Sequence, residues 1–180
     1  AEFRINYEDM EQGADFDMDA IGRYIIKLNK DGRVQIDMVS EYASASYIQP
    51  MGYVISGTEQ DGPYLEIRDK DTAEDKFIFY EYNTPPNRAP GFCIGKDANP
   101  SSDDYKECKN LGLRATRYFT PSSNATVANF LKDPLWYAAK YGIPGRDTST
   151  ISGDPDNYFL VTNAATLKDQ LTKAFNDIMQ

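Results

Sequence analysis

Apolar and polar positions alternate with a period of two over residues 21–28, and residues 34–38 repeat the alternation. Between these two runs stands Asn29-Lys30-Asp31-Gly32. Asn, Asp and Gly are the residues that tight turns favour, and a period of two is typical of a strand with one buried face. The pattern therefore predicts an antiparallel β-hairpin.

Further apolar runs follow in the same half of the chain. Residues 52–56 and 64–68 are separated by a loop rich in Gly, Asp and Pro, which predicts a second hairpin. The aromatic run 77–82 is a strand candidate, and residues 113–120 look extended. Residues 83–111, rich in Pro, Gly, Asn and Asp, are expected to form a long loop.

The pattern changes to a helical one after residue 130. Asp133 and Pro134 suit the N-cap and first turn of a helix over 135–141, and Gly142 is a natural stop. Residues 158–161 predict a short buried strand, and the last helix opens at Thr166. In that helix the apolar positions recur at helical spacing: Leu167, Leu171, Ala174, Phe175 and Ile178.

Together these elements predict an α+β fold, with antiparallel β-hairpins and a cystine loop followed by two helices that flank a short strand. We expect a β-rich module over residues 1–120, which carries an acidic loop and the cystine loop. A helix-strand-helix segment should follow over residues 121–180.

Composition narrows the classes of partner. The 180 residues carry a formal net charge of −9 and contain no histidine. Nucleic acid is an unfavourable partner because phosphate binding needs clustered Lys and Arg. No apolar run approaches the roughly 18 residues of a membrane span, so we expect no membrane insertion. The chain opens at Ala1 without the basic and apolar segments of a signal peptide, and we expect a fragment of a longer precursor.

The two cysteines, Cys93 and Cys108, both lie in the predicted loop. A disulfide would close that loop and stabilise it by about 3 kcal/mol in the chain-entropy model. Two free thiols are the alternative, and a zinc site would need further ligands in a chain without histidine. We favour the disulfide, which indicates export to the periplasm or the cell surface.

No catalytic constellation stands out, and we expect no enzyme. The absence of histidine excludes Ser-His-Asp and Cys-His machinery. The glycines match neither the phosphate-binding loop nor the dinucleotide-binding pattern. The sequence leaves open a catalytic pair of carboxylates of the kind that glycoside hydrolases use, because such a pair is defined by its separation in space.

An acidic segment near the N-terminus is the candidate metal site. Asp15, Asp17 and Asp19 alternate, so their carboxylates would share one face of an extended segment. Like charges at that spacing repel unless a cation compensates them, and Ca²⁺ prefers oxygen ligands. The alternative is a solvated acidic loop. The segment 147–152 resembles the D-x-S-x-S metal motif, but Ile151 replaces its second serine and no hydrophobic strand precedes it.

Several segments, in order, resemble the PilC/PilY family of type IV pilus tip-associated proteins. The segments that carry the resemblance are 7–9 (YED), 13–19 (GADFDMD), 52–58 (GYVISGT), 131–142 (LKDPLWYAAKYG) and 155–163 (PDNYFLVTN). The helical segment 131–142 is the most specific, since it is long and holds the single tryptophan, Trp136.

The resemblance implies a fragment of the N-terminal region that contains a von Willebrand factor A fold. In this reading, residues 158–180 are the closing strand and helix of the A domain, and the hairpins and cystine loop are a β-rich elaboration. It further implies a fimbrial, extracellular location at the pilus tip, with roles in pilus assembly, adhesion and surface sensing. The expected partners are minor pilins, and host or abiotic surfaces; calcium is a possible cofactor, and the ligand-binding residues are unknown.

Departures from the family pattern limit what can be carried over. Ala14 stands where the family often has a second glycine, and Gly142-Ile143-Pro144 stands where Gly-Gly-Phe is common. The loop before Pro155 lacks the usual D-x-D-G run, so no metal site is carried over from it. Two alternatives remain open: a structural spacer in an exported A-domain protein, and an exported carboxylate-pair hydrolase.

Overall fold

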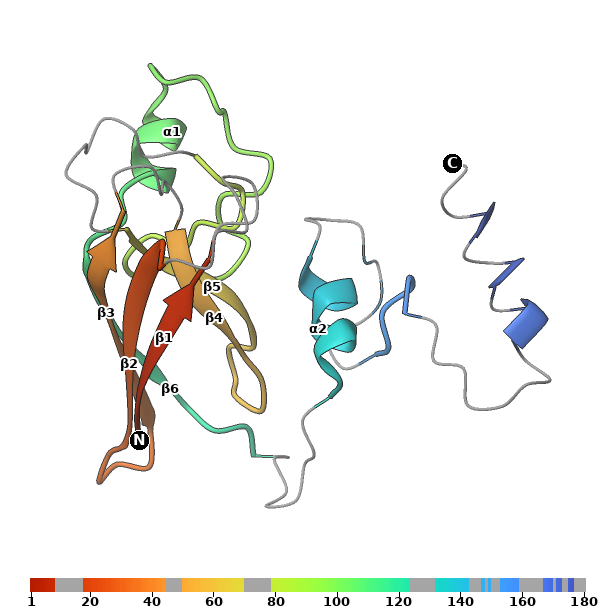
Figure 1. Ribbon diagram of the computed structural model, residues 1–180, viewed down its shortest axis with the longest axis horizontal. Helices are drawn as coiled ribbons and strands as arrows, with labels where there is room; N and C mark the ends of the chain where they lie inside the picture. Colours follow the sequence, from red (N-terminus) through yellow and green to blue (C-terminus); the bar gives the residue numbers. More distant parts are fainter. Residues whose placement is uncertain are drawn as a thin grey trace. The chain divides into compact units, whose positions relative to one another are not determined.

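The chain forms two compact units, Ala1–Asn129 and Phe130–Gln180. The computed structural model (Figure 1) describes residues 1–8, 18–44, 50–69, 79–123, 132–142, 147, 149, 153–158, 167–169, 171–172 and 175–176. The first unit contains two antiparallel sheets and a short helix, and the second contains helix α2.

Four strands make the larger sheet, in the order β1 (Glu2–Tyr7), β2 (Ala20–Leu28), β3 (Val34–Ala43) and β6 (Arg114–Phe119). The smaller sheet pairs β4 (Pro50–Ile55) with β5 (Gly62–Arg68). Both predicted hairpins are present, as β2–β3 and β4–β5, and the extended segment 113–120 contains β6.

The turn of the first hairpin is the one that its residues favour. Gly32 has a positive φ of 82°, a conformation that glycine adopts without steric cost. The N–H of Asn29 donates to the carbonyl of Arg33 at 2.9 Å, and the Asp31 carboxylate accepts from the N–H of Arg33 at 3.0 Å. This turn fixes the register of β2 against β3.

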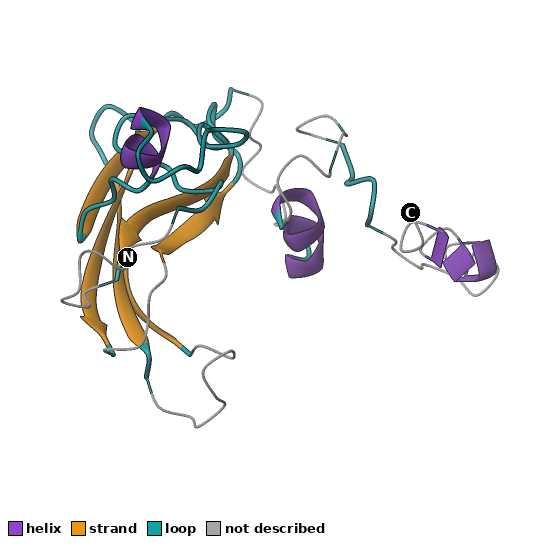
Figure 2. Cartoon of the chain, turned by 90° about the horizontal axis from the view of Figure 1, so that it is seen from above, coloured by secondary structure: helices purple, strands orange, loops and turns teal. Residues whose placement is uncertain are grey.

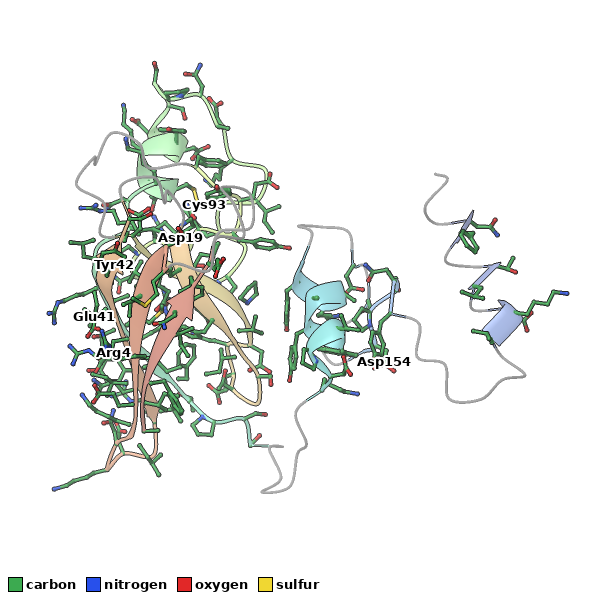
Figure 3. All side chains as sticks on the ribbon, viewed as in Figure 1. Arg4, Asp19, Glu41, Tyr42, Cys93 and Asp154 are labelled. Carbon is green, nitrogen blue, oxygen red and sulfur yellow. A yellow bond between two sulfur atoms is a disulfide. The ribbon has the colours of Figure 1, made fainter. Side chains whose placement is uncertain are left out.

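Strand β1 is an element that the hydrophobic pattern did not lead us to expect. It pairs antiparallel with β2, with Phe3 opposite Tyr24 and Ile5 opposite Gly22. Arg4 lies beside Glu41 of β3 (Figure 3), with its Nε 2.7 Å from the carboxylate. This ion pair spans the sheet from its β1 edge to β3, and both side chains contact solvent.

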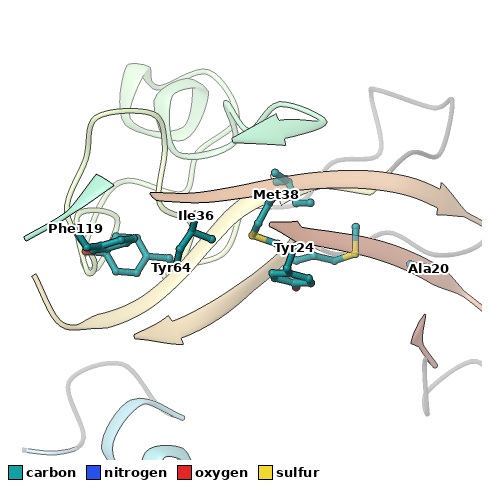
Figure 4. Close-up of a cluster of buried hydrophobic side chains, with 8 residues drawn as sticks. Ala20, Tyr24, Ile36, Met38, Tyr64 and Phe119 are labelled. Carbon is teal, nitrogen blue, oxygen red and sulfur yellow. The ribbon is translucent and has the colours of Figure 1, made fainter. Parts of the chain in front are cut away.

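The core lies between the two sheets (Figure 4). Its buried side chains come from both of them: Ala20, Tyr24, Ile36, Met38 and Phe119 from the larger sheet, and Met51, Tyr64 and Ile67 from the smaller. The rings of Tyr64 and Phe119 meet edge to face, with centroids 5.2 Å apart. Aromatic pairs of this geometry stabilise a core beyond the area that they bury.

Gly52 marks an irregularity in the smaller sheet, where the register shifts between Met51 and Gly52. A Cβ at this position would overlap the backbone carbonyl of Tyr64 on the neighbouring strand. The Gly52 carbonyl accepts a hydrogen bond from the Tyr24 hydroxyl at 2.9 Å, which ties the two sheets together. Glycine is therefore required here by the close approach of the two backbones.

The predicted disulfide is present, joining Cys93 to Cys108, and both cysteines are fully buried. The interpretation of residues 83–111 as loop throughout was wrong, because residues 103–108 form the short helix α1 (Asp103–Cys108). Ser102 caps it by accepting from the N–H of Tyr105 at 3.0 Å. Figure 1 and Figure 2 show α1 and the neighbouring loops at one end of the strands.

The strand predicted over 77–82 is not found in its described part. Residues 79–82 form no strand; residues 81–82 form a turn, and the N–H of Asn83 donates to the carbonyl of Tyr80 at 3.0 Å. Residues 77–78 lie outside the described residues. Aromatic content alone is a weak strand signal, since such residues also pack in loops: Phe79 stacks on Tyr105 at 5.8 Å.

In the second unit, helix α2 (Pro134–Tyr141) begins and ends where the sequence predicts. The Asp133 carboxylate caps it by accepting from the N–H of Leu135 at 2.7 Å. Gly142 keeps a right-handed conformation, and its N–H donates to the carbonyl of Ala138 at 2.7 Å. A side chain at residue 142 would overlap that carbonyl, so the glycine serves close packing at the helix end.

The rest of the second unit is described in part. Tyr158 is not in a strand, and residues 159–161 of the predicted strand lie outside the described residues. Residues 167–169, 171–172 and 175–176 are helical. Their large apolar side chains are exposed: Leu167, Leu171 and Phe175. Among the described residues, no helix has the length and apolar character needed to cross a bilayer.

Candidate functional site

A pocket of about 530 Å³ lies beside β6 in the first unit. One wall is β6 itself, from Arg114 to Tyr118, and the other is the segment 86–89. Gln60, Glu66 and Thr84 complete the lining. We call this pocket the β6 groove. Its size lies within the range of small-ligand and peptide sites.

A buried ion pair forms part of the groove. The Nε of Arg117 donates to one carboxylate oxygen of Glu66, and the Tyr53 hydroxyl donates to the other at 3.1 Å. Glu66 is 2% exposed and the Arg117 side chain 15%. The guanidinium also donates to the carbonyls of Arg88 at 2.6 Å and Pro85 at 3.4 Å. Arg117 thus connects β6, β5 and the segment 85–88.

The pKa values of the ionisable groups in this cluster are raised by burial, and the Arg117 charge opposes that effect. Burial raises the pKa of Glu66 above its usual range, although the Arg117 guanidinium and its hydrogen bond act in the opposite direction. Burial raises the pKa of Tyr64 to about 12, against the effect of Arg117. Burial, together with the Glu66 charge, raises the pKa of Tyr53. The phenols therefore stay protonated at neutral pH.

The three arginines of the groove differ in how their charge is compensated. Arg117 pairs with Glu66, and the Nη2 of Arg88 lies 2.5 Å from the Glu107 carboxylate of α1. Arg114 is exposed and has no carboxylate within 4.0 Å among the described residues. Among the described residues, the β6 groove therefore presents one positive charge without a paired carboxylate, in a chain of net charge −9.

A second polar cluster lies against helix α2. The Lys140 ammonium is 2.6 Å from the Asp147 carboxylate, which also accepts from the Ser149 hydroxyl at 2.8 Å and the Asp156 N–H at 2.9 Å. Burial acts to raise the pKa of Asp147, but the hydrogen bonds from Lys140, Asp156 and Ser149 together lower it to about 2. This carboxylate is a structural tie between α2 and the following loop.

Trp136 lies one helical turn before Lys140, on the same face of α2. It is buried, and its Nε1 donates to the Asp154 carboxylate at 2.8 Å. Lys132 lies 5.5 Å from the indole ring and 3.4 Å from the same carboxylate. The hydrogen bond from Trp136 and the charge of Lys132 hold the pKa of Asp154 below its usual value.

The comparisons with known proteins identify the family. Residues 1–111 match the family model described as PilY1 homolog, beta-sandwich. The chain belongs to the PilY1 family. The two face-to-face sheets of the first unit agree with the name of that model. The chain is also 48% identical, over 99% of its length, to a type IV pilus biogenesis factor PilY1 homolog of Xylella fastidiosa.

That relative is much longer than the present chain. The chain spans 12% of the length of the curated PilY1 homolog that it matches. No solved structure matches the chain. The resemblance to the PilC/PilY family is therefore confirmed at the level of the family, and the roles of the whole protein are a matter for proposal.

The sequence-predicted metal site falls mostly outside the described part of this PilY1-family chain. Asp15 and Asp17 lie in residues 9–17, which the structure does not describe. Asp19 is 7% exposed, and its N–H donates to the carbonyl of Tyr7 at 3.1 Å. Within the described ranges, no group of three acidic or cysteine side chains could hold a metal ion. The calcium hypothesis stays a prediction.

The residues of the β6 groove were not anticipated, although the PilY1-family sequence contains a signal for one of them. In the run 114–119 (RATRYF), Arg117 has the same parity as Ala115 and Phe119, so it faces inward with them. A charged residue at an inward position implies a buried partner. That partner, Glu66, lies 51 residues away in the sequence, so the local pattern cannot identify it.

Proposed function

We propose that this chain is a non-catalytic, exported module of a type IV pilus biogenesis protein that acts at the pilus tip. The observation that carries the proposal is the 48% identity over 99% of the chain to a type IV pilus biogenesis factor. At that identity the relative and this chain share their fold, and the module is expected to serve the same assembly.

Export is supported by the disulfide. Cys93 and Cys108 are bonded and fully buried, and they close a loop next to the sheets. Disulfides persist in oxidising compartments such as the bacterial periplasm and the cell surface. The proposed location is therefore the periplasm, followed by the pilus tip or the outer cell surface.

A binding role, in preference to catalysis, is supported by how the charged side chains are used. Glu66 and Asp147, two buried or nearly buried carboxylates, each pair with a cation, Arg117 and Lys140. A general acid or base needs a carboxyl group that can reach a substrate and exchange a proton with it. The chain also contains no histidine. These features favour a surface that recognises a partner.

We further propose that residues 158–180 close an A-like domain, as the family resemblance implies. The helical residues near the C-terminus support this assignment, because Leu167, Leu171 and Phe175 lie on one helical face and are 42–62% exposed. An apolar stripe of this kind calls for a surface to cover it. A sheet of the same A-like domain would supply that surface.

The partners proposed for the module are minor pilins or other tip components, and host or abiotic surfaces during adhesion and surface sensing. Exposed tyrosines of the larger sheet, Tyr42 and Tyr118, support contact with such surfaces. Tyrosine rings offer a large apolar area together with a hydroxyl that binds through hydrogen bonds, and they are enriched at interfaces.

A complementation experiment tests the proposal. The gene that encodes this chain is deleted in its source organism and restored either whole or with an in-frame deletion of residues 1–180. The proposal predicts that the deletion version fails to restore surface pili or adhesion, while the protein is still exported. Normal piliation and adhesion by the deletion version would contradict it.

The spacer alternative is tested in the same strains. Residues 1–180 are replaced by an unrelated exported β-sandwich domain of similar size. Full recovery of piliation and adhesion with the unrelated domain would mean that the module only separates its neighbours. Recovery by the native module alone supports a specific binding role.

A further inference from the structure

The outer edge of β6 is closed by backbone hydrogen bonds at its two ends. The carbonyl of Gly112 accepts from the N–H of Arg68 at 2.9 Å, and that of Thr120 accepts from the N–H of Glu59 at 3.0 Å. Between these two points β6 and the smaller sheet diverge, and the β6 groove occupies the gap.

The register shows which residues of β6 direct their backbone groups into that gap. The N–H of Ser40 donates to the carbonyl of Leu113, so the odd-numbered residues of β6 bond to β3. In an antiparallel ladder the intervening residues direct their N–H and C=O to the opposite edge. These residues are Arg114, Thr116 and Tyr118, and no backbone partner for them occurs within the described residues.

An edge of this kind favours a second backbone as its partner. These three residues, every second one along β6, offer alternating backbone donors and acceptors over about 14 Å. This repeat matches the backbone of an extended peptide. The groove beside them holds about 530 Å³, room for a short segment of chain. A saccharide or a free anion would leave most of this regular row of N–H and C=O groups unpaired.

The charge of the groove indicates the kind of peptide. Arg88 and Arg117 are neutralised by Glu107 and Glu66. Arg114, at one end of the groove, has no carboxylate within 4.0 Å in the part of the chain that the structure describes. A carboxylate on a bound peptide strand would pair with the Arg114 guanidinium through a charge-assisted hydrogen bond.

We propose that the β6 groove binds an extended peptide segment that adds a strand to the free edge of β6 and places an acidic side chain against Arg114. Backbone pairing with Arg114, Thr116 and Tyr118 supplies affinity, and the guanidinium selects for an acidic residue. The inference rests on the groove itself and does not depend on the pilus context.

Peptide binding to the isotope-labelled 180-residue chain tests the proposal by NMR. The probe is a short synthetic peptide of alternating valine and glutamate, and the comparison peptide carries lysine in place of glutamate. The acidic peptide is expected to bind saturably and to shift the amide signals of residues 114, 116 and 118. Shifts confined to the β1 edge, or equal binding of both peptides, would overturn the proposal.

Two pairs of variants make the test specific. Arg114→Ala should weaken binding of the acidic peptide about tenfold through loss of a charge-assisted hydrogen bond. The matched control Arg4→Ala removes an arginine from the opposite edge of the sheet and should leave affinity unchanged. Thr116→Pro removes an outward N–H and should abolish binding, whereas Thr116→Val should retain it.

Competition with free glutamate separates peptide recognition from simple anion binding. The proposal predicts that free glutamate does not displace the peptide at concentrations near the dissociation constant of the peptide. If free glutamate displaced the peptide as effectively as unlabelled peptide does, the backbone edge of β6 would play no part in binding, and the proposal would be overturned. Circular dichroism of each variant verifies that the sheets are intact.

Discussion

Replacing Arg117 by methionine should destabilise the first unit through the charge that it leaves behind. Glu66 is 2% exposed, and without Arg117 its carboxylate would keep, among the described residues, only the hydrogen bond from Tyr53. Removing one partner of a buried ion pair typically costs about 3–5 kcal/mol. For a chain of this size the melting temperature should fall by roughly 6–20 °C.

The pH dependence gives the variant a distinct signature. The folded-state pKa of Glu66 is already raised by burial, and loss of the opposing Arg117 charge should raise it further. A carboxyl whose pKa is higher in the folded than in the unfolded state binds its proton more tightly when folded. The stability of Arg117→Met should therefore increase as pH falls from 7 to 5.

The assay is urea unfolding at pH 7 and pH 5, followed by the near-ultraviolet circular dichroism of the tyrosines. Fluorescence of Trp136, the single tryptophan, reports on the second unit separately. The double variant Glu66→Gln with Arg117→Met should recover most of the lost stability and show little change between the two pH values.

A matched control removes an exposed pair. Arg4→Met breaks the ion pair with Glu41, in which the Arg4 side chain is 63% exposed, and should change the free energy of unfolding by less than about 1 kcal/mol. The reasoning is refuted if Arg117→Met has the same stability as Arg4→Met at pH 7, or if it loses stability on acidification to pH 5.

Three further predictions concern the disulfide, Gly52 of β4 and the Asp147 carboxylate beside α2. Changing both Cys93 and Cys108 to serine should cost about 3 kcal/mol and lower the melting temperature by roughly 6–12 °C, measured by calorimetry; an unchanged value would mean that the bond does not constrain the fold. Gly52→Ala should cost at least about 2 kcal/mol in urea unfolding, because the new Cβ overlaps a backbone carbonyl; wild-type stability would show that the sheet adjusts freely. The pKa of Asp147 is about 2 in the folded state, below its usual value of 3.8. The ionised carboxylate therefore stabilises the second unit fully at pH values above about 3.8, and this contribution should disappear as pH falls through 2. Trp136 fluorescence follows this transition, and Asp147→Asn should flatten it; identical profiles for the two proteins would rule out the pairing.

The elements defined by strong local signals were predictable from sequence. The turn at 29–32 has its glycine at positive φ, and Asp133 with Pro134 begins α2 as such pairs commonly do. In both cases the residues next to each other in sequence supply the hydrogen bonds that define the element. Local chemistry was therefore sufficient.

Strand β1 and helix α1 were missed, although each contains a signal. In β1, Phe3, Ile5 and Tyr7 alternate with polar residues, but the run is short and lies at the N-terminus. In α1, Ser102 precedes two aspartates, a pattern that favours a helix start. Both elements depend on long-range partners: β1 on pairing with β2, and α1 on the disulfide at its last residue.

The candidate site could not be predicted because its parts are far apart in sequence. In β5 the apolar, polar, apolar order of Leu65, Glu66 and Ile67 suggests that the glutamate faces solvent. Glu66 is nevertheless buried, because Arg117 of β6 enters the same face. The free edge of β6 depends on how the two sheets diverge between Gly112 and Thr120. Such features follow from tertiary packing, which local periodicity does not encode.

Immunoblotting of sheared pili tests the central claim most directly. An antibody raised against this chain is applied to pili sheared from the source organism, to the exported soluble fraction, and to the same fractions from a strain without the major pilin. The account predicts a signal in the pilus fraction that is absent from the strain without pili. A signal confined to the soluble fraction in both strains would contradict a role as a component of the type IV pilus.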